Sequence, residues 1–594
     1  MKSSKSGVEK YDIIPNEETE VINECARILS EKFALHAGVV LKNDGNKLTA
    51  KQFEIKFVIK KCAAEKSGAF KISSSGRKVV IFGQGKSGIY AATGHLLKNC
   101  IFKENKVQVK LPKVTQKKPS LKFRGHLLAN HPYRNNYSEW EINDWAEYLQ
   151  EMALWGSNIL WTDGIEIYPG VDPLDSKEPY SDINHYKEWK RQSAIQSALP
   201  DVCSSYGMDF GVWYPPNGVY ELKVDRLLKK GKKLFREDMD HRKYVCPSIK
   251  QARELILKYR EYLFSRISRI DHFLIPAADN GGCSCKECTP WVKTYLKLCK
   301  EQYDLLKKFH PNAKLWLSNQ QLKEEGTKYL VKELLKQKKP WVNGIVFGPH
   351  GWNLEYLNEK VGKKFDIVLY PDITHTSRSQ YQMPDSSYPL NLIVGRESLI
   401  GIRPSFFKKI FMETTKYANG ESPYSEGIHD DFNKFLWSTW AMDKTVTSDE
   451  AVKDYAALYF GYGTKEKFLE LAKVLEKNWV TDIRNNGAGI DKALVLLDEI
   501  YALIPESFRK NNWRFELFRM ETRMFKLVWL WLIKGRKNKE FKKYFAGTLA
   551  VRKEIYSLCK LKMVPAYSFD WMFTQEYDHA KCMAAKENLF VKMG

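Results

Sequence analysis

The chain has 594 residues, of which 43% are hydrophobic, 28% charged and 13% aromatic, including 17 Trp and 31 Tyr. This composition excludes a disordered or fibrous protein, and the length predicts about three domains, each able to bury a core. The 95 Lys and Arg exceed the 71 Asp and Glu, which gives a net charge of +24. Such an excess favours a polyanion, an anionic surface or an acidic small substrate as partner. The lysines are scattered rather than gathered in a basic stripe with interleaved aromatics, so we expect no nucleic-acid partner.

The sequence contains no segment typical of a membrane protein. No run reaches the roughly 18 apolar residues needed to span a bilayer. Residues 1–10 lack the apolar core of a signal peptide. We therefore expect a cytoplasmic protein, or a periplasmic or extracellular one whose signal has been removed. The odd count of 11 Cys fits a reducing compartment better than a full disulfide framework.

Residues 1–118 are predicted to form a small α/β domain. Helical spacing covers residues 20–33, residues 53–59 alternate like a strand, and the apolar strand 79–82 precedes a helix over 89–97. Between that strand and helix, residues 83–88 match the G-x-G-x-x-G pattern of dinucleotide sites. A dinucleotide site also needs an acidic residue about 20 positions later, at the end of a second parallel strand. No clear second strand precedes that position in this sequence. We interpret the motif as a tight turn and expect no organic cofactor.

Residues 119–445 carry the pattern of a (β/α)₈ TIM barrel. Short apolar runs alternate with helical stretches, as buried parallel strands do. The runs cover residues 123–129, 158–163, 208–214, 272–279, 314–319, 344–350 and 365–372, with a weaker eighth at 424–428. Eight strand–helix repeats over about 320 residues predict the closed barrel. A doubly wound sheet is the alternative, with fewer strands and a nucleotide site.

Residues 446–594 are predicted to form a helical C-terminal domain. Strand signals stop after residue 443, and helical spacing covers residues 451–460 and 465–477. The segment 513–531 is rich in Trp and Met, which is typical of a core helix. We expect these helices to pack against the side of the barrel.

A cysteine-rich loop follows the predicted fourth strand. It contains Cys283, Cys285 and Cys288. Thiolates at this spacing could hold zinc, but a structural site needs a fourth ligand, which Cys246, His272 or Cys299 could supply only through the fold. The alternative is a compact loop with packed thiols, and from the sequence we assign no metal ligand.

Acidic residues lie at or just after several predicted strand ends. A parallel barrel brings the carboxyl ends of its strands to one face, where enzymes with this fold keep their sites. Cleavage of a glycosidic bond needs two carboxyl groups there, one as proton donor and one as base or nucleophile. The candidates are Asp163, Glu166, Asp279, Asp372, Glu426 and Asp430. One such Asp alone would more often be a helix N-cap, but several acids together with aromatic residues at the same strand ends favour a site.

Aromatic and polar residues near the same strand ends are predicted to line a sugar-binding pocket, because aromatic faces suit the apolar faces of sugar rings. They are Trp161, Trp213, Tyr214, Trp316, Asn319, His350, Trp352 and Tyr370. For any single aromatic residue the alternative is the barrel core, since strand side chains also point inward.

At this point the chain resembles a known group of enzymes. Residues 70–73 and 79–97 look like the non-catalytic N-terminal α/β domain of α-glucuronidases and β-hexosaminidases, and residues 123–126, 278–291 and 424–434 are similar to segments of bacterial glycoside hydrolases of that clan. The resemblance implies a proton donor after the fourth barrel strand, a role that Asp279 inherits. Asn280 follows it, where hexosaminidases carry an adjacent Asp-Glu pair, which argues against substrate-assisted cleavage of an N-acetyl sugar.

We therefore predict an exo-acting glycoside hydrolase that cleaves a terminal sugar from an oligo- or polysaccharide. Glu426 is the first choice for the second carboxylate, with Asp163, Glu166 and Asp372 behind it. Arg124 and His126 would line the pocket, and Arg124 could pair with a carboxylate if the sugar is acidic. The alternative is a non-catalytic carbohydrate-binding protein on a degenerate barrel.

Overall fold

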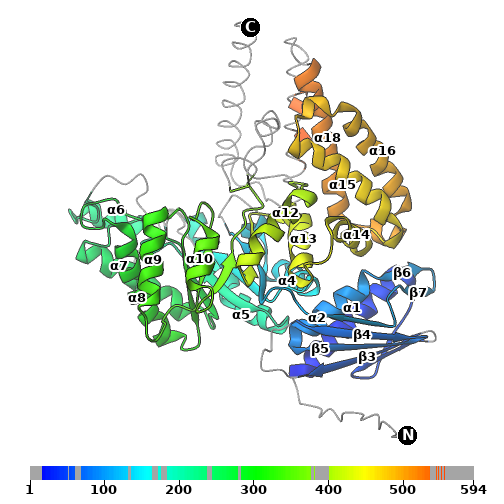
Figure 1. Ribbon diagram of the computed structural model, residues 1–594, viewed down its shortest axis with the longest axis horizontal. Helices are drawn as coiled ribbons and strands as arrows, with labels where there is room; N and C mark the ends of the chain where they lie inside the picture. Colours follow the sequence, from blue (N-terminus) through cyan, green and yellow to red (C-terminus); the bar gives the residue numbers. More distant parts are fainter. Residues whose placement is uncertain are drawn as a thin grey trace.

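The computed structural model describes residues 17–50, 53–60, 68–130, 136–163, 171–175, 183–236, 244–277, 282–375, 380–381 and 400–534, and residues 543, 544, 546, 547, 550, 551 and 554. It shows an N-terminal α/β domain, a central barrel and a group of C-terminal helices (Figure 1). Within these ranges, no helix combines the length and apolar character required to cross a membrane.

The N-terminal domain is built on a six-stranded sheet in the order β1-β2-β3-β5-β4-β8, with a β6-β7 hairpin beside it. Helix α2 packs on strands β3, β4 and β5, and α1 packs against α2. The elements are α1 Glu17–Ala37, β1 Lys42–Asn43, β2 Lys47–Ala50, β3 Phe53–Lys60, β4 Phe70–Ser75, β5 Lys78–Gln84, α2 Gly85–Leu97, β6 Cys100–Lys103, β7 Lys106–Val109 and β8 Val114–Lys117.

The Gly-rich motif forms the turn from β5 into α2. Gly85 has a φ of 67°, in the left-handed region that favours glycine. A Cβ atom on Gly83 would lie 2.5 Å from the Ile89 nitrogen, and one on Gly88 would lie 2.6 Å from the Ala69 carbonyl oxygen. The left-handed φ of Gly85 and the close backbone packing at Gly83 and Gly88 therefore account for the three glycines.

The barrel has eight parallel strands, and it closes because β9 pairs with both β16 and β10. The predicted TIM barrel is confirmed, and the doubly wound alternative is excluded. The strands are β9 Phe123–Leu128, β10 Ile159–Asp163, β11 Asp209–Trp213, β12 His272–Ile275, β13 Lys314–Ser318, β14 Gly344–Phe347, β15 Asp366–Leu369 and β16 Gly420–Glu421. The helices in the same region are α3 Asn136–Glu139, α4 Ile142–Trp155, α5 Ile183–Ser205, α6 Glu221–Lys229, α7 Lys250–Arg266, α8 Trp291–Phe309, α9 Glu324–Leu335, α10 Leu354–Val361, α12 Pro404–Thr414, η2 Thr415–Tyr417, η3 Ile428–Asp430 and α13 Asp431–Met442.

The eighth strand begins four residues before the position predicted from the sequence. It is split into β16 and a second piece, β17 Tyr424–Ser425, and both pieces pair with β9. Pro423 lies between them and has no N–H to donate, although its carbonyl oxygen accepts from Leu127 N at 3.0 Å. The first piece carries no apolar run, which is why the sequence pattern located only the second.

The interior of the barrel is filled by large side chains. Trp161 and Trp316 are buried there, and Gly211 and Gly344 on neighbouring strands leave the space that the two indoles occupy. Trp316 Nε1 donates to His272 Nδ1 at 2.8 Å. The predicted pocket residues Trp161 and Trp316 are therefore part of the core.

The C-terminal region is helical wherever it is described. Its elements are α14 Ser448–Tyr459, η4 Tyr462–Thr464, α15 Lys465–Val480, η5 Ile483–Asn485, α16 Gly487–Leu503, α17 Glu506–Arg509 and α18 Trp513–Lys534. The Trp- and Met-rich segment is α18, which buries Phe515, Phe518, Met524 and Trp531.

Helix α13 joins this region to the barrel, and every one of its residues is buried. The Asp431 carboxylate accepts hydrogen bonds from Tyr148 on α4 at 2.9 Å, Tyr455 on α14 at 2.8 Å and Arg514 on α18 at 2.7 Å. One buried acid thus connects three helices from separate parts of the chain.

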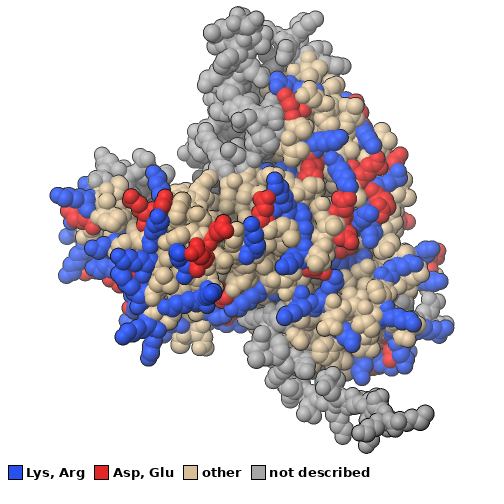
Figure 2. Space-filling model, in the orientation of Figure 1, with Lys and Arg blue, Asp and Glu red and all other residues tan. Residues whose placement is uncertain are grey.

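The positive charge is distributed rather than concentrated. Lys and Arg are spread over the visible face of all three regions, with Asp and Glu among them (Figure 2). This surface agrees with the scattered pattern of lysines in the sequence.

Candidate active site

Asp163 and Trp213 lie side by side at the carboxyl ends of β10 and β11, where they are register partners. Trp161 and Trp213 belong to the interior cluster, and side chains alternate along a strand, so Asp163 also faces inward. Both Asp163 and Trp213 are buried, and Trp213 Nε1 has no hydrogen-bond partner among the described residues. This end of the barrel therefore presents a carboxylate beside an indole N–H that could reach a ligand.

Tyr424 on β17 lies at the centre of the predicted acids. Its hydroxyl donates to Glu426 Oε1, and its ring lies 5.4 Å from that of Tyr370 and stacks on His375 at 5.7 Å. Burial raises the pKa of Tyr424 well above 10, and the charges of Glu426 and Asp163 raise it further. One carboxylate at the end of β10 and one directly after β17 thus act on the same phenol.

A histidine links two of the predicted acids. His375 Nδ1 lies 2.7 Å from Asp372 Oδ2, and its Nε2 lies 3.3 Å from Glu426 Oε1. Asp372 also accepts from the backbone N–H groups of Thr374 at 3.2 Å and His375 at 3.1 Å. These bonds hold the Asp372 carboxylate in place, so the imidazole is oriented toward Glu426.

Beneath this group, Thr374 joins Asp430 to the same network. Its hydroxyl donates to Asp430 and accepts from Glu426 N at 3.0 Å. Lys434 on α13 donates to the Tyr137 hydroxyl and lies 3.3 Å from the Gly427 carbonyl oxygen. Burial lowers the pKa of Lys434 to about 7, an effect that Asp430 and Asp431 partly offset.

Arg124 lies at the other end of the barrel, so the structure does not bring it together with the predicted acids around Tyr424. It is the second residue of β9, and its Nε and Nη1 donate to the carbonyl oxygens of Gly156 at 2.9 Å and Leu121 at 2.8 Å. Burial lowers its pKa to about 10, with Glu421 opposing the shift. A side chain near the amino end of a parallel strand points away from the face where the strand ends meet, although it belongs to the same apolar run.

His126 and Tyr214 face outward from the barrel and do not line its mouth. His126 Nε2 lies 2.9 Å from Ser438 Oγ on α13. The Tyr214 ring is covered by the Arg260 guanidinium at 3.9 Å. Strand alternation explains both corrections, because each residue neighbours an inward-facing position in the sequence.

Asn319, His350 and Trp352 form a separate group in the loops after β13 and β14. Asn319 is buried and donates to the Trp352 carbonyl oxygen at 3.5 Å. Trp352 is half-buried against Tyr356, with Lys328 Nζ 5.5 Å from its ring, and His350 is exposed. The structure does not place these residues in the network around Tyr424. Asp279 and Glu166 lie outside the described residues.

The sequence interpretation missed several residues of the network. Thr374 and His375 lie two and three residues after Asp372, so extending the seventh run by three residues would have included them. Arg403 is also buried here, and its charge interacts with that of Asp372. Its Nε and Nη2 have no partner in the described part of the chain, whereas Nη1 donates to the Tyr381 carbonyl oxygen at 2.7 Å.

A large cavity lies elsewhere, between the N-terminal domain and the amino ends of the barrel strands. Its volume is about 1130 Å³. Its basic lining residues are Lys71, Lys117, Lys118, Lys122, Arg124 and Lys314. Enzymes with this fold keep their sites at the carboxyl end of the barrel, so we assign the candidate active site to the group around Tyr424 rather than to this cavity.

Comparisons with known proteins support the fold. No protein-family model matches the chain, and no curated protein matches it in sequence. A solved family GH115 4-O-methyl-α-glucuronidase with specificity for decorated arabinogalactans gives a TM-score of 0.57 at 10% identity, over 91% of this chain and 75% of that one. A family GH89 protein from Clostridium perfringens, in complex with its substrate GlcNAc-α-1,4-galactose, gives 0.55 at 12% identity, over 90% and 65%. The chain has the fold of these glycoside hydrolases, as the sequence resemblance predicted.

Proposed function

We propose that this protein is an exo-acting glycoside hydrolase that removes a terminal sugar from an oligo- or polysaccharide. The observation that carries the proposal is the group of four buried carboxylates at the carboxyl end of the barrel: Asp163, Asp372, Glu426 and Asp430. Burying so many ionisable groups in one place is costly, and such groups concentrate at functional sites. The fold shared with a glucuronidase and a family GH89 enzyme supports the reaction class.

Glu426 is our candidate for the base or nucleophile. The Tyr424 hydroxyl donates to it and His375 lies beside it, and both contacts stabilise an ionised carboxylate in a fixed position. Asp372 then acts as a positioning residue, because its carboxylate orients His375. Asp163 is the second candidate for the same role.

Asp279 is our candidate for the proton donor. It follows β12, the fourth strand of the barrel, which is the position that the family resemblance implies for this group. A donor with its proton would protonate the leaving oxygen as the glycosidic bond breaks. Glu426 would then act on water or on the anomeric carbon.

An acidic sugar would need a cation close to these carboxylates. With Arg124 at the opposite end of the barrel, we assign this role to Arg403, whose guanidinium is near Asp372 and has two nitrogens without a described partner. The planar guanidinium could bind a carboxylate through two parallel hydrogen bonds. The structural neighbour named as a glucuronidase acts on an acidic sugar, which supports this choice.

The test is a hydrolysis screen over aryl glycosides and aryl uronides, repeated with Asp279→Asn. We expect one class to be cleaved, and we expect the variant to lose about 10²- to 10⁴-fold in kcat on aryl groups that leave poorly. The loss should be small for a dinitrophenyl leaving group, because that anion needs no proton. The exposed residue Asp304 provides the control variant Asp304→Asn, which should keep the wild-type rate.

Two results would contradict the proposal. Sugar binding without cleavage of any substrate would favour a non-catalytic carbohydrate-binding protein. An equal rate for Asp279→Asn and wild type on every leaving group would remove Asp279 from the mechanism.

A further inference from the structure

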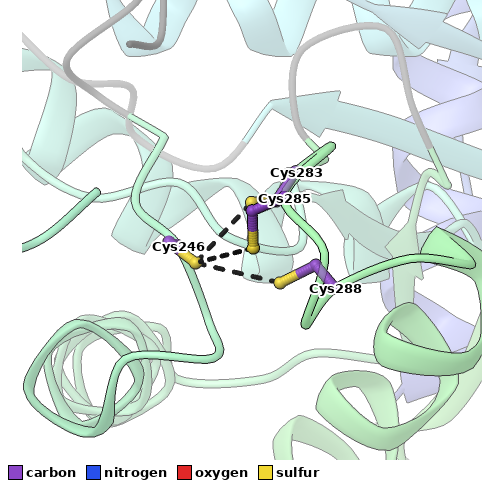
Figure 3. A group of neighbouring side chains, drawn as sticks. All are labelled: Cys246, Cys283, Cys285 and Cys288. Carbon is purple, nitrogen blue, oxygen red and sulfur yellow. Dashed lines mark hydrogen bonds between the residues drawn. The ribbon is translucent and has the colours of Figure 1, made fainter. Parts of the chain in front are cut away.

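Four cysteines from two separate loops come together beside the barrel. They are Cys246, Cys283, Cys285 and Cys288, and all four are buried. Their sulfur atoms lie within 4.8 Å of one another. In Figure 3 the side chain of Cys246 faces the three cysteines of the other loop across a small common space.

The sulfur separations fit one tetrahedral metal ion. Cys246 Sγ lies 3.6 Å from Cys283 Sγ, 3.7 Å from Cys285 Sγ and 3.8 Å from Cys288 Sγ. A zinc ion binds thiolates at about 2.3 Å, so the edge of a regular ZnS₄ tetrahedron is about 3.8 Å. A disulfide would require about 2.05 Å between two sulfurs, and these cysteines are free.

We propose that these four cysteines bind one Zn²⁺ ion as a structural site. Thiolates favour zinc over magnesium or calcium, which prefer oxygen ligands. Four protein ligands fill the tetrahedral shell and leave no position for a reacting water, so the role is structural rather than catalytic.

The sequence offered three residues as the fourth ligand, namely Cys246, His272 and Cys299. The structure identifies Cys246 as the one that lies with the other thiols. His272 is already bonded to Asp209, at 3.0 Å, and to Trp316. Cys299 lies on α8 and interacts with Tyr295. Cys246 alone of the three belongs to the sulfur group.

A buried amide holds the two cysteine-bearing loops together next to the sulfurs. Asn217 Nδ2 donates to the carbonyl oxygens of Val245 and Gly282, each at 2.9 Å, and its Oδ1 accepts from Gly282 N at 2.9 Å. Each contacted residue is next to a cysteine in the sequence. The protein thus brings Cys246 and Cys283 into position with its own hydrogen bonds.

Polar groups around the sulfurs resemble the outer shell of a metal site. Ser248 Oγ lies 3.0 Å from Cys246 Sγ and accepts from Arg236 Nε at 2.9 Å. Arg236 Nη1 also lies 3.3 Å from Glu287 Oε1 on the other loop. Four thiolates and one Zn²⁺ carry a net charge of −2, and a nearby guanidinium offsets part of it.

The site would connect the loops that follow the third and fourth barrel strands. Cys246 lies between α6 and α7, and the other cysteines lie between β12 and α8. Asp279 is four residues before Cys283 in the sequence. If the proposed function is correct, the zinc ion would anchor the loop that carries the proton donor.

Metal analysis of the purified full-length chain tests the site. We expect about one zinc per chain by inductively coupled plasma mass spectrometry, and less than about a fifth of that in the double variant Cys246→Ser/Cys288→Ser. The matched control is Cys100→Ala, which removes a buried thiol from the N-terminal domain and should keep the full zinc content.

A measurement on the wild-type chain covers the case in which the double variant does not fold. Cobalt exchanged into the site should give the visible absorption bands of tetrahedral Co²⁺ with thiolate ligands, and chelation should lower the thermal midpoint. Absence of zinc together with absence of these bands would overturn the proposal, and so would bound iron or a disulfide among the four residues. None of these readouts uses hydrolysis, so an inactive protein would contradict the proposed function and leave the zinc site standing.

Discussion

The two ends of the barrel differ in where their charged groups lie. At the carboxyl end, carboxylates are buried and held by specific donors, as Tyr424 and His375 hold Glu426. At the amino end, a cavity of about 1130 Å³ is lined by lysines. The two ends thus differ in kind, because one gathers desolvated and oriented carboxylates and the other surrounds a cavity with lysines. Desolvated and oriented titratable groups concentrate at functional sites, which is why we propose the carboxyl end as the active site.

The lysines at the amino end have a different role, because two of them connect parts of the chain. Lys117 on β8 pairs with Asp443 at 2.5 Å, and Lys122 pairs with Asp366 on β15 at 2.7 Å. These side chains are partly exposed, so each pair contributes at most about 1 kcal/mol. The two ends should therefore respond very differently to substitution.

The largest expected effect is that of Glu426→Gln at the carboxyl end. The change keeps the shape of the side chain and removes the charge, so kcat on the cleaved substrate should fall by about 10³-fold while the thermal midpoint changes little. Initial rates and thermal unfolding of the purified variant measure both quantities.

The matched control is Asp271→Asn, an acid that lines the cavity at the amino end and accepts from Phe210 N at 2.9 Å. Its rate should remain within about twofold of wild type. Equal losses in the two variants would show that the comparison between the ends is wrong.

The next prediction concerns Lys434, whose pKa in the folded protein is about 7. In the unfolded chain a lysine titrates near 10.4, so between these values the folded state binds fewer protons, and the free energy of unfolding should rise with pH. In the variant Lys434→Met, which has no titrating group at this position, we expect this rise in the free energy of unfolding to be absent. Urea unfolding at pH 7 and pH 9.5 measures the free energy of unfolding of both proteins. The difference between wild type and variant should change by on the order of 3 kcal/mol between the two pH values.

The exposed residue Lys297 on α8 provides a control for this measurement. Lys297→Met should follow wild type at both pH values. A wild-type curve that runs parallel to that of Lys434→Met would mean that Lys434 keeps an ordinary pKa in the folded protein.

The smallest effect is expected for Lys71→Ala/Lys118→Ala, which removes two exposed lysines from the amino-end cavity. We expect kcat/KM to change less than about twofold and stability by less than about 0.5 kcal/mol. Steady-state kinetics on the best substrate of the screen measures the first. A loss above tenfold would place substrate contacts at this end.

Much of the barrel was predictable because buried parallel strands leave continuous apolar runs, and seven of these runs coincide with β9 to β15. Whether a given strand side chain points into the barrel or out of it was harder to predict. His126 and Leu127 are neighbours in one apolar run, yet His126 faces α13 and Leu127 faces the barrel interior. In a continuous apolar run, the sequence does not show which of two neighbouring residues faces the interior.

The acids were found because residue type and strand end coincide at Asp163 and Asp372. Their partners were not, because the contacts come from distant segments: His375 meets Glu426 across 51 positions, and Lys434 reaches Tyr137 across 297. Cys246 shows the same limit, since 37 positions separate it from Cys283.

The three hydrogen bonds to Asp431 have a consequence for the order in which the chain folds during synthesis. Its partner Arg514 lies 83 positions later in the sequence. Until Arg514 leaves the ribosome, the Asp431 carboxylate on α13 lacks the guanidinium that pairs with it. Burying this carboxylate without a cation would cost free energy, so closing the barrel around α13 is unfavourable at that stage. We therefore expect the barrel to wait for the C-terminal helices, and a chain that ends before Arg514 to accumulate as an incompletely folded, protease-sensitive species.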